Sequence, residues 1–177
     1  PRPPAVETTP PRRYPLPMDF PRWIAELRAL HDRARRGELS GPDRTRYLAD
    51  RNDFARALLA SQRLALAPGQ RPRELLRAKR ALRVELVLTG RTETALTLDV
   101  SSGGFSAFLG EEPGPNALPV KLLLPQGDPV AATACCVHSA RFQGRVRCSF
   151  RFEEIGEADR ERLELLVFDA LLEHLRG

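Results

Sequence analysis

The spacing of apolar side chains changes between residues 66 and 83, and that change limits the possible folds more than any other feature. Between residues 19 and 66, apolar residues recur every three or four positions, whereas between residues 83 and 152 they alternate with polar ones. The first spacing places apolar side chains on one side of a helix, and the second places them on one face of a strand. The sequence therefore predicts a helical N-terminal part followed by a β-sheet part.

The alternating part divides into six short segments, and Gly-, Pro- and Asn-containing turns separate them. Because no helical pattern lies between these segments, we expect a mainly β, α+β fold built on a small six-stranded antiparallel barrel. A final helix is expected from about Glu157, with its leucines on one face. The expected strands are Arg83–Leu88, Thr94–Val100, Phe105–Leu109, Val120–Leu124, Val130–Ser139 and Arg145–Phe152.

The N-terminal part is predicted to be a helical hairpin over residues 19–69, after a proline-rich tail at residues 1–18. Asp19 is placed to cap the first helix, and Ser40 with Asp43 forms a capping pattern for the second. The broad apolar side of this hairpin packs on its own domain, on a second copy of the chain, or on a partner protein. The sequence leaves these three possibilities open.

Length and composition favour one folded domain with an extension. The chain has 177 residues, of which 42% are hydrophobic, enough for a core. No apolar run is long enough to cross a membrane and no signal peptide is visible, so we expect a cytoplasmic protein without a membrane partner. The cysteines Cys135, Cys136 and Cys148 show neither a disulfide framework nor zinc spacing, and we expect all three to be buried.

The positive charge is concentrated in one segment. Residues 71–83 contain six basic residues and one acid, a net charge of +5 that equals the excess of the whole chain. One short basic segment suits a compact anion better than a nucleic acid, and 6% aromatic residues offer few platforms for stacking bases. Within the segment, we expect Arg71, Arg73 and Arg77 to form a solvated linker surface.

Catalytic and metal sites have no support in the sequence. The three histidines fall on separate expected elements, and no phosphate-binding loop, nucleophile elbow or zinc-protease motif occurs. Cys136 and His138 lie on one strand face, which is better explained by packing than by a catalytic dyad. We therefore expect no enzyme activity, no metal and no cofactor.

Two segments carry groups that suit a guanine nucleotide with phosphates. Lys79, Arg80 and Arg83 precede the first strand, and guanidinium groups match phosphate oxygens and the O6/N7 edge of guanine. At the end of the second strand, Asp99 can accept from the Watson–Crick edge of guanine and Ser101 can donate a hydroxyl. Gly103 and Gly104 permit a tight turn. The alternative is that Asp99, Ser101 and Gly104 form only a hydrogen-bonded corner between strands.

At these residues the chain resembles the PilZ domain, a bacterial receptor for cyclic di-GMP. The family has an R-x-x-x-R stretch before its first barrel strand and a D/N-x-S-x-x-G motif soon after it. Asp99, Ser101 and Gly104 match the second motif fully, and Lys79 and Arg83 match the first with lysine in place of arginine. A literal R-x-x-x-R at Arg73–Arg77 lies six residues upstream. The resemblance covers about residues 77–177.

The resemblance implies a non-enzymatic cyclic di-GMP receptor whose ligand is held by Lys79, Arg80, Arg83, Asp99, Ser101 and Gly104. It also implies that ligand binding orders the basic linker at residues 70–82 and rearranges the helices before the barrel at residues 83–177. A partner protein or a second copy would then bind through the hairpin. The alternative is a degenerate PilZ module that binds proteins but not the nucleotide, since lysine lacks the paired donors of arginine.

Overall fold

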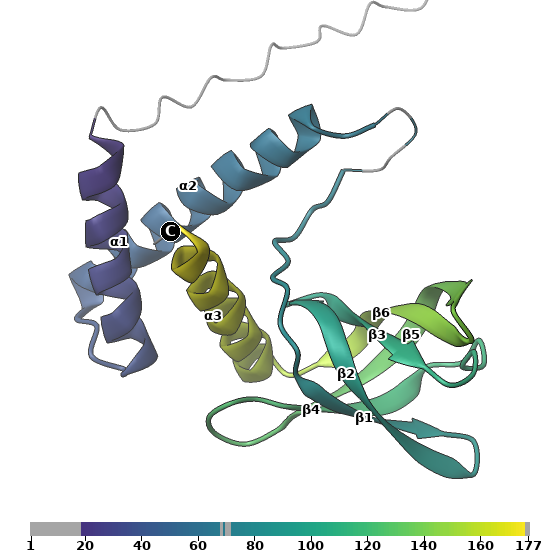
Figure 1. The fold of residues 1–177 in the computed structure, drawn as a ribbon. Coiled ribbons are helices and arrows are strands. Elements are labelled where there is room, and N and C mark those ends of the chain that lie inside the picture. Colours follow the sequence, from purple (N-terminus) through teal and green to yellow (C-terminus); the bar gives the residue numbers. More distant parts are fainter. Residues whose placement is uncertain (1–18, 68, 70–71, 176–177) are drawn as a thin grey trace, which may run out of the picture. The chain divides into compact units, whose positions relative to one another are not determined.

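The computed structural model describes residues 19–67, 69 and 72–175. The expected proline-rich tail and Arg71 lie outside these described residues. The chain divides into two compact units, with the boundary between Ala57 and Leu58. Figure 1 shows two helices at the start of the described chain, then a barrel, then a last helix. No helix among the described residues is both long and apolar enough to cross a membrane.

Two helices begin the described chain: α1 spans Phe20–Arg35 and α2 spans Gly41–Leu64. The carboxylate of Asp19 accepts from the backbone amide of Arg22, as the expected cap requires. The Asp43 amide donates to the Ser40 hydroxyl, and a hydrogen bond joins their side chains. Hydrogen bonding to Ser40, and then to Arg33, lowers the pKa of Asp43. Both helix starts predicted from the sequence are therefore confirmed within one residue.

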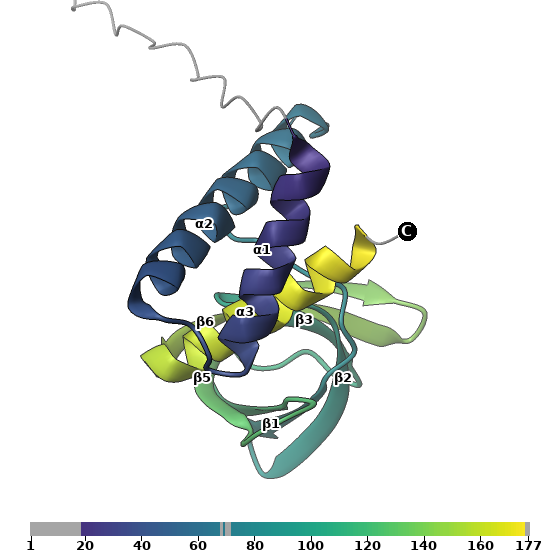
Figure 2. The same ribbon diagram turned by 90° about the vertical axis from the view of Figure 1, so that its left-hand side faces the viewer.

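The two helices pack on each other through aromatic and polar side chains, and Figure 2 shows them as neighbours. Trp23 donates from its indole nitrogen to Asp50 across 3.1 Å, and its ring lies 6.2 Å from that of Phe54. A buried hydrogen bond of 2.9 Å joins His31 to the hydroxyl of Tyr47. The pair is a helical hairpin with its own small core, as predicted.

Six antiparallel strands close into a barrel in the order β1-β2-β3-β6-β5-β4. Every expected strand is present, and β1 has the predicted bounds. The others extend beyond prediction by a few residues or shift slightly. The strands are β1 Arg83–Leu88, β2 Arg91–Ser101, β3 Gly104–Leu109, β4 Leu118–Leu123, β5 Val130–Phe142 and β6 Arg145–Ile155.

The barrel core consists of the inward side chains of alternating residues. Phe105 of β3 and Phe150 of β6 are fully buried, and their rings stack at 4.8 Å. Helix α3, Glu157–His174, adds Leu163 and Val167 to the same core. This burial is why α3 belongs to the barrel unit, in agreement with the predicted C-terminal helix.

The prediction that all three cysteines are buried is wrong for two of them. Only Cys148 is buried, whereas Cys135 and Cys136 are partly exposed. Cys135 lies on the outer face of the barrel, where its thiol donates to Glu153 across 2.8 Å. This hydrogen bond, followed by burial, raises the pKa of Cys135. Alternation along β5 sends neighbouring residues to opposite faces, so Cys135 lies outside the barrel while Cys136 packs partly buried against its core.

Candidate functional site

The motif residues Ser101 and Gly104 form the corner between β2 and β3. The Ser101 hydroxyl donates to the Gly104 carbonyl across 3.1 Å and accepts from the Gly103 amide at 3.3 Å. Ser101 is only 2% exposed. The Ser101 hydroxyl therefore forms its hydrogen bonds within the turn, and the residue stabilises the corner.

Gly104 is required by the close approach of the next strand. A Cβ atom at this position would lie 2.0 Å from the carbonyl oxygen of Phe150, and the backbone φ is +155°. Backbone atoms cannot yield as a flexible side chain can, so any other residue would push β3 away from β6. The glycine of the motif thus keeps the corner tightly closed.

Asp99 occupies the outer face beside this corner, with its side chain 16% exposed. One carboxylate oxygen accepts from the Ser106 hydroxyl across 2.8 Å, and the other lies 3.1 Å from Nη1 of Arg77. Arg147 of β6 lies 3.9 Å from the carboxylate. Asp99 is therefore an oriented acceptor between two arginines, which is suited to holding a polar, anionic ligand.

The end of the basic segment is attached to β2. The backbones of Ala78 and Val100 exchange two hydrogen bonds of 3.0 Å. The buried hydroxyl of Thr97 accepts from the Leu82 amide and donates to the Arg80 carbonyl. Residues 78–82 consequently run antiparallel to β2, and this register puts Lys79 opposite Asp99 on the same face.

The predicted basic ligands do not all point the same way. Lys79 is exposed on the face of Asp99. Arg80, the next residue, extends instead to α3, where it lies 2.7 Å from Glu173 and 3.9 Å from Asp169. Arg83 is 57% exposed and lies 3.5 Å from Glu85 at the start of β1. The register of the Ala78–Val100 bridge thus places Lys79 beside the corner of Asp99, Ser101 and Gly104, while Arg80 is engaged with α3.

The expectation that Arg77 belongs to a solvated linker surface is wrong. Its side chain is 32% exposed and forms the ion pair with Asp99. Sequence reasoning also missed Ser106, Thr97 and Arg147. For Ser106 a signal was present, because it lies on the strand following the motif and alternation puts it on the outer face. Arg73, by contrast, is exposed as expected.

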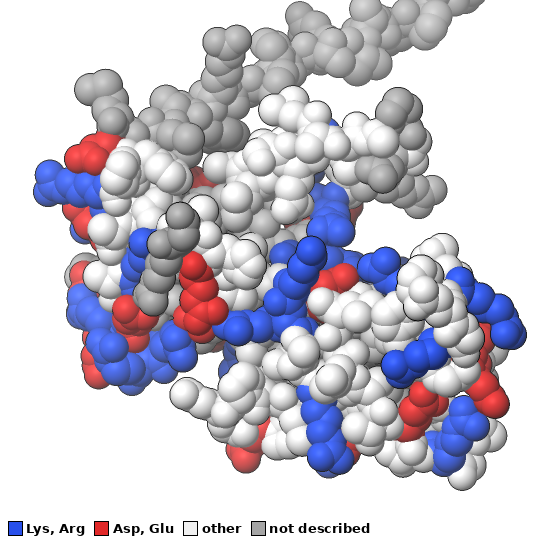
Figure 3. Space-filling view, viewed as in Figure 1, with Lys and Arg blue, Asp and Glu red and all other residues white. Residues whose placement is uncertain are grey.

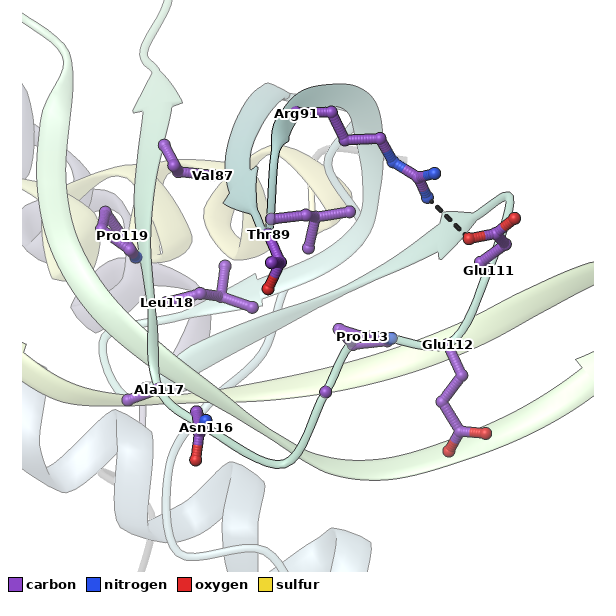
Figure 4. A pocket seen from close by; sticks show the side chains of 12 residues that line it. Val87, Thr89, Arg91, Glu111, Glu112, Pro113, Asn116, Ala117, Leu118 and Pro119 are labelled. Carbon is purple, nitrogen blue, oxygen red and sulfur yellow. Dashed lines mark hydrogen bonds and ion pairs between the residues drawn. The ribbon is translucent and has the colours of Figure 1, made fainter.

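A separate cavity of about 410 Å³ lies at the other end of the barrel. It is formed by the turn between β1 and β2 and by the loop before β4, and an ion pair of 3.0 Å between Arg91 and Glu111 borders it (Figure 4). None of the predicted ligand residues lines this cavity. It is therefore distinct from the surface around Asp99.

A comparison with known protein families shows to which of them this chain belongs. The family model described as PilZ domain matches residues 70–169, more than half of the sequence. The chain belongs to the PilZ domain family. The match confirms the resemblance found at the two motifs and includes the whole basic segment. No curated protein matches the chain significantly.

The chain is similar to solved structures at low sequence identity. The Bacillus subtilis inhibitor of motility (MotI/DgrA) is 17% identical with a TM-score of 0.54, over 59% of this chain and 53% of that one. Escherichia coli YcgR in complex with c-di-GMP is 19% identical with a TM-score of 0.49, over 59% and 47%. The present chain thus spans about half the length of these proteins.

Proposed function

We propose that this PilZ protein is a non-enzymatic receptor that binds cyclic di-GMP on the outer barrel face around Asp99. The observation that carries the proposal is the oriented carboxylate of Asp99 beside the guanidinium of Arg77, within an intact D-x-S-x-x-G motif. A carboxylate can accept from N1 and N2 of guanine, and nearby cations match the phosphates. Family membership and the cyclic di-GMP in the YcgR structure support this assignment.

The ligand would contact the basic segment as well as the barrel. Lys79, on the same face as Asp99, provides a point charge for a phosphate, and Arg83 provides a second cation at the start of β1. Ser101 and Gly104 support the site by closing the corner that holds Asp99 in place. Arg80 would join only after leaving Glu173 and Asp169 of α3.

The proposal extends to a role in signalling. Because residues 78–82 adjoin the site and continue toward the helical hairpin, a bound ligand would change the conformations available to this segment. The hairpin would then present its surface differently to a partner protein or a second copy. Such coupling must be reciprocal, so the partner would also change the affinity for the nucleotide.

Isothermal titration calorimetry with cyclic di-GMP tests the proposal. We expect binding with a Kd in the micromolar range or tighter, about −8 kcal/mol or better. Asp99→Asn should weaken binding, whereas the matched control Asp128→Asn, in the loop before β5, should not. Cyclic di-AMP lacks the guanine edge and should bind far more weakly. A folded protein that gives no heat with cyclic di-GMP would support the alternative, a PilZ module that binds only proteins.

A further inference from the structure

The hairpin of β5 and β6 extends beyond the closed part of the barrel. β5 pairs with β4 only from Val130 to Ala134, whereas its pairing with β6 continues to Phe142. Along residues 135–142, here named the free edge, no strand in the described part of the chain pairs with the other side of β5. An unpaired strand edge presents backbone donors and acceptors that another extended chain can use.

Exposed apolar side chains lie along the free edge. Val137 is 53% exposed and Phe142 is 56% exposed. The ring of Phe142 stacks at 6.0 Å on that of Phe108 from β3, and this holds the hairpin tip in one conformation. Edges of natural sheets are usually protected by charge, proline or bulges. Here an irregular register between Cys136 and His138 interrupts the pairing, and the edge is regular again from His138 to Phe142.

The segment that forms the free edge and the following turn is positively charged. Residues 136–146 contain two arginines, Arg141 and Arg145, and no acidic residue. Arg141 and Arg145 are exposed, and Arg145 lies over the ring of Phe108 at 5.7 Å. Two carboxylates contact the free edge: Glu112 accepts from the Ser139 hydroxyl, and Glu153 accepts from the Cys135 thiol. In Figure 3, blue side chains adjoin uncharged white ones at the right-hand side, where Figure 1 shows this hairpin, and red side chains lie next to them.

This charge selects the kind of chain that can pair with the edge. A second copy paired in a register centred on Arg141 would bring the two Arg141 side chains together, and like charges across paired strands are destabilising. A nucleic acid would satisfy the arginines but cannot continue the backbone ladder of a sheet. An extended peptide with carboxylates satisfies both the arginines and the ladder.

We propose that the free edge of β5 binds an extended, acidic segment of a partner protein. The segment would add as a strand beside residues 138–142, with carboxylates on one face toward Arg141 and apolar side chains on the other face against Val137 and Phe142. This surface lies outside the nucleotide site proposed above and does not depend on it. It assigns the barrel itself a partner surface, in addition to the helical hairpin.

Fluorescence anisotropy with the full chain and a labelled peptide tests this docking. The probe is an alternating Glu-Val peptide of about eight residues, long enough to cover the free edge. The control peptide replaces each Glu with Lys. We expect the acidic peptide to bind and the basic one to bind at least about tenfold more weakly, with affinity falling as salt rises.

Variants locate the binding. Arg141→Glu and Phe142→Glu should each weaken acidic-peptide binding by about tenfold or more. Val87→Glu, at a site on β1 that is 49% exposed, should leave it unchanged. Asp99→Asn should also bind the peptide normally, which separates this surface from the nucleotide site. Amide NMR shifts should cluster at residues 137–142.

The proposal is overturned if both peptides bind equally, or if the acidic peptide fails to bind at millimolar concentration. It is also overturned if Arg141→Glu binds as the unmodified chain does. Sedimentation equilibrium supplies a further check. Dimers that disappear in Phe142→Glu would assign the free edge to a second copy, and retention on single-stranded DNA that Arg141→Glu abolishes would assign it to nucleic acid. Either result would exclude the acidic peptide segment.

Discussion

Nη1 of Arg77 lies 3.1 Å from a carboxylate oxygen of Asp99, on a residue that the family motif assigns to ligand binding. The two side chains are 32% and 16% exposed, so the pair is only partly screened by solvent. In the proposed site, Asp99 would therefore meet the ligand with one oxygen already paired to a cation. A ligand with both a guanine edge and phosphates could use this arrangement, because the carboxylate binds the base while the guanidinium remains close to the anion.

Arg77→Ala should weaken cyclic di-GMP binding by about tenfold, which corresponds to about 1.4 kcal/mol. The physical reason is the loss of a partly buried cation that adjoins the ligand surface and orients Asp99. Calorimetry measures the effect, and Arg73→Ala is the matched control because Arg73 is exposed. If Arg77→Ala binds more tightly than the unmodified chain, Arg77 is instead a competitor that the ligand must displace from Asp99.

Ser101→Ala should lower the stability of the barrel. The buried hydroxyl makes two hydrogen bonds within the corner, to Gly104 and Gly103, and each is worth about 1 kcal/mol. We expect a loss of about 1–3 kcal/mol in urea unfolding with an unchanged m-value. Asp99→Asn should cost less, because an amide oxygen can still accept from the Ser106 hydroxyl. Equal stability of Ser101→Ala and the unmodified chain would contradict the structural role of this hydroxyl.

The sequence predicted the strands well because a barrel imposes strict alternation. β1 reads Arg-Val-Glu-Leu-Val-Leu, and its inward Val84 and Leu86 are fully buried. Prediction was weaker where that constraint ends. The last residues of β5 extend beyond the barrel, so burial no longer imposes alternation between apolar and polar residues there. The predicted end of this strand at Ser139 is therefore three residues short of its end at Phe142.

The candidate site was only partly predictable for a different reason. The residues of the D-x-S-x-x-G motif are close in sequence, so their proximity at one corner follows from local structure. Arg77 reaches Asp99 only because residues 78–82 pair with β2 in the register set by the Ala78–Val100 bridge. Such a register is set by tertiary packing, and no local pattern in residues 71–83 indicates it.

Glu173→Gln tests whether Arg80 can serve the ligand. In the structure this carboxylate holds the Arg80 guanidinium at 2.7 Å, away from Asp99. Because the pair is exposed, its removal should cost less than about 1 kcal/mol of stability. If Arg80 contributes to binding, cyclic di-GMP affinity should rise by roughly threefold, as the competing interaction is weakened. Glu157→Gln, at the opposite end of α3 and 93% exposed, is the control. An unchanged affinity in Glu173→Gln would remove Arg80 from the ligand set.

The cysteines should differ in their reactivity toward iodoacetamide, because the thiolate is the reactive form. Burial raises the pKa of Cys148 to about 12, so this residue should remain unmodified at pH 8 in the folded protein. The hydrogen bond to Glu153 raises the pKa of Cys135, which should slow its alkylation. Glu153→Gln removes the negative charge and should speed the reaction of Cys135, while leaving Cys148 protected. Peptide mass spectrometry over time measures both rates. No acceleration in Glu153→Gln would show that this carboxylate does not control the thiol.

Lys79→Arg tests the substitution that separates this chain from the family motif. Lys79 is exposed and lies opposite Asp99, so its ammonium can reach a ligand on that face as a point charge. An arginine there could make paired hydrogen bonds to guanine O6 and N7 or to phosphate oxygens, and a good bidentate pair is worth about 1–3 kcal/mol. We therefore expect cyclic di-GMP to bind about fivefold or more tightly to Lys79→Arg, measured by calorimetry at constant salt. Lys121→Arg, at an exposed site on β4, is the matched control and should leave the affinity unchanged. If Lys79→Arg has no effect while Arg77→Ala abolishes binding, the ligand is held two residues upstream of the position that the family motif indicates.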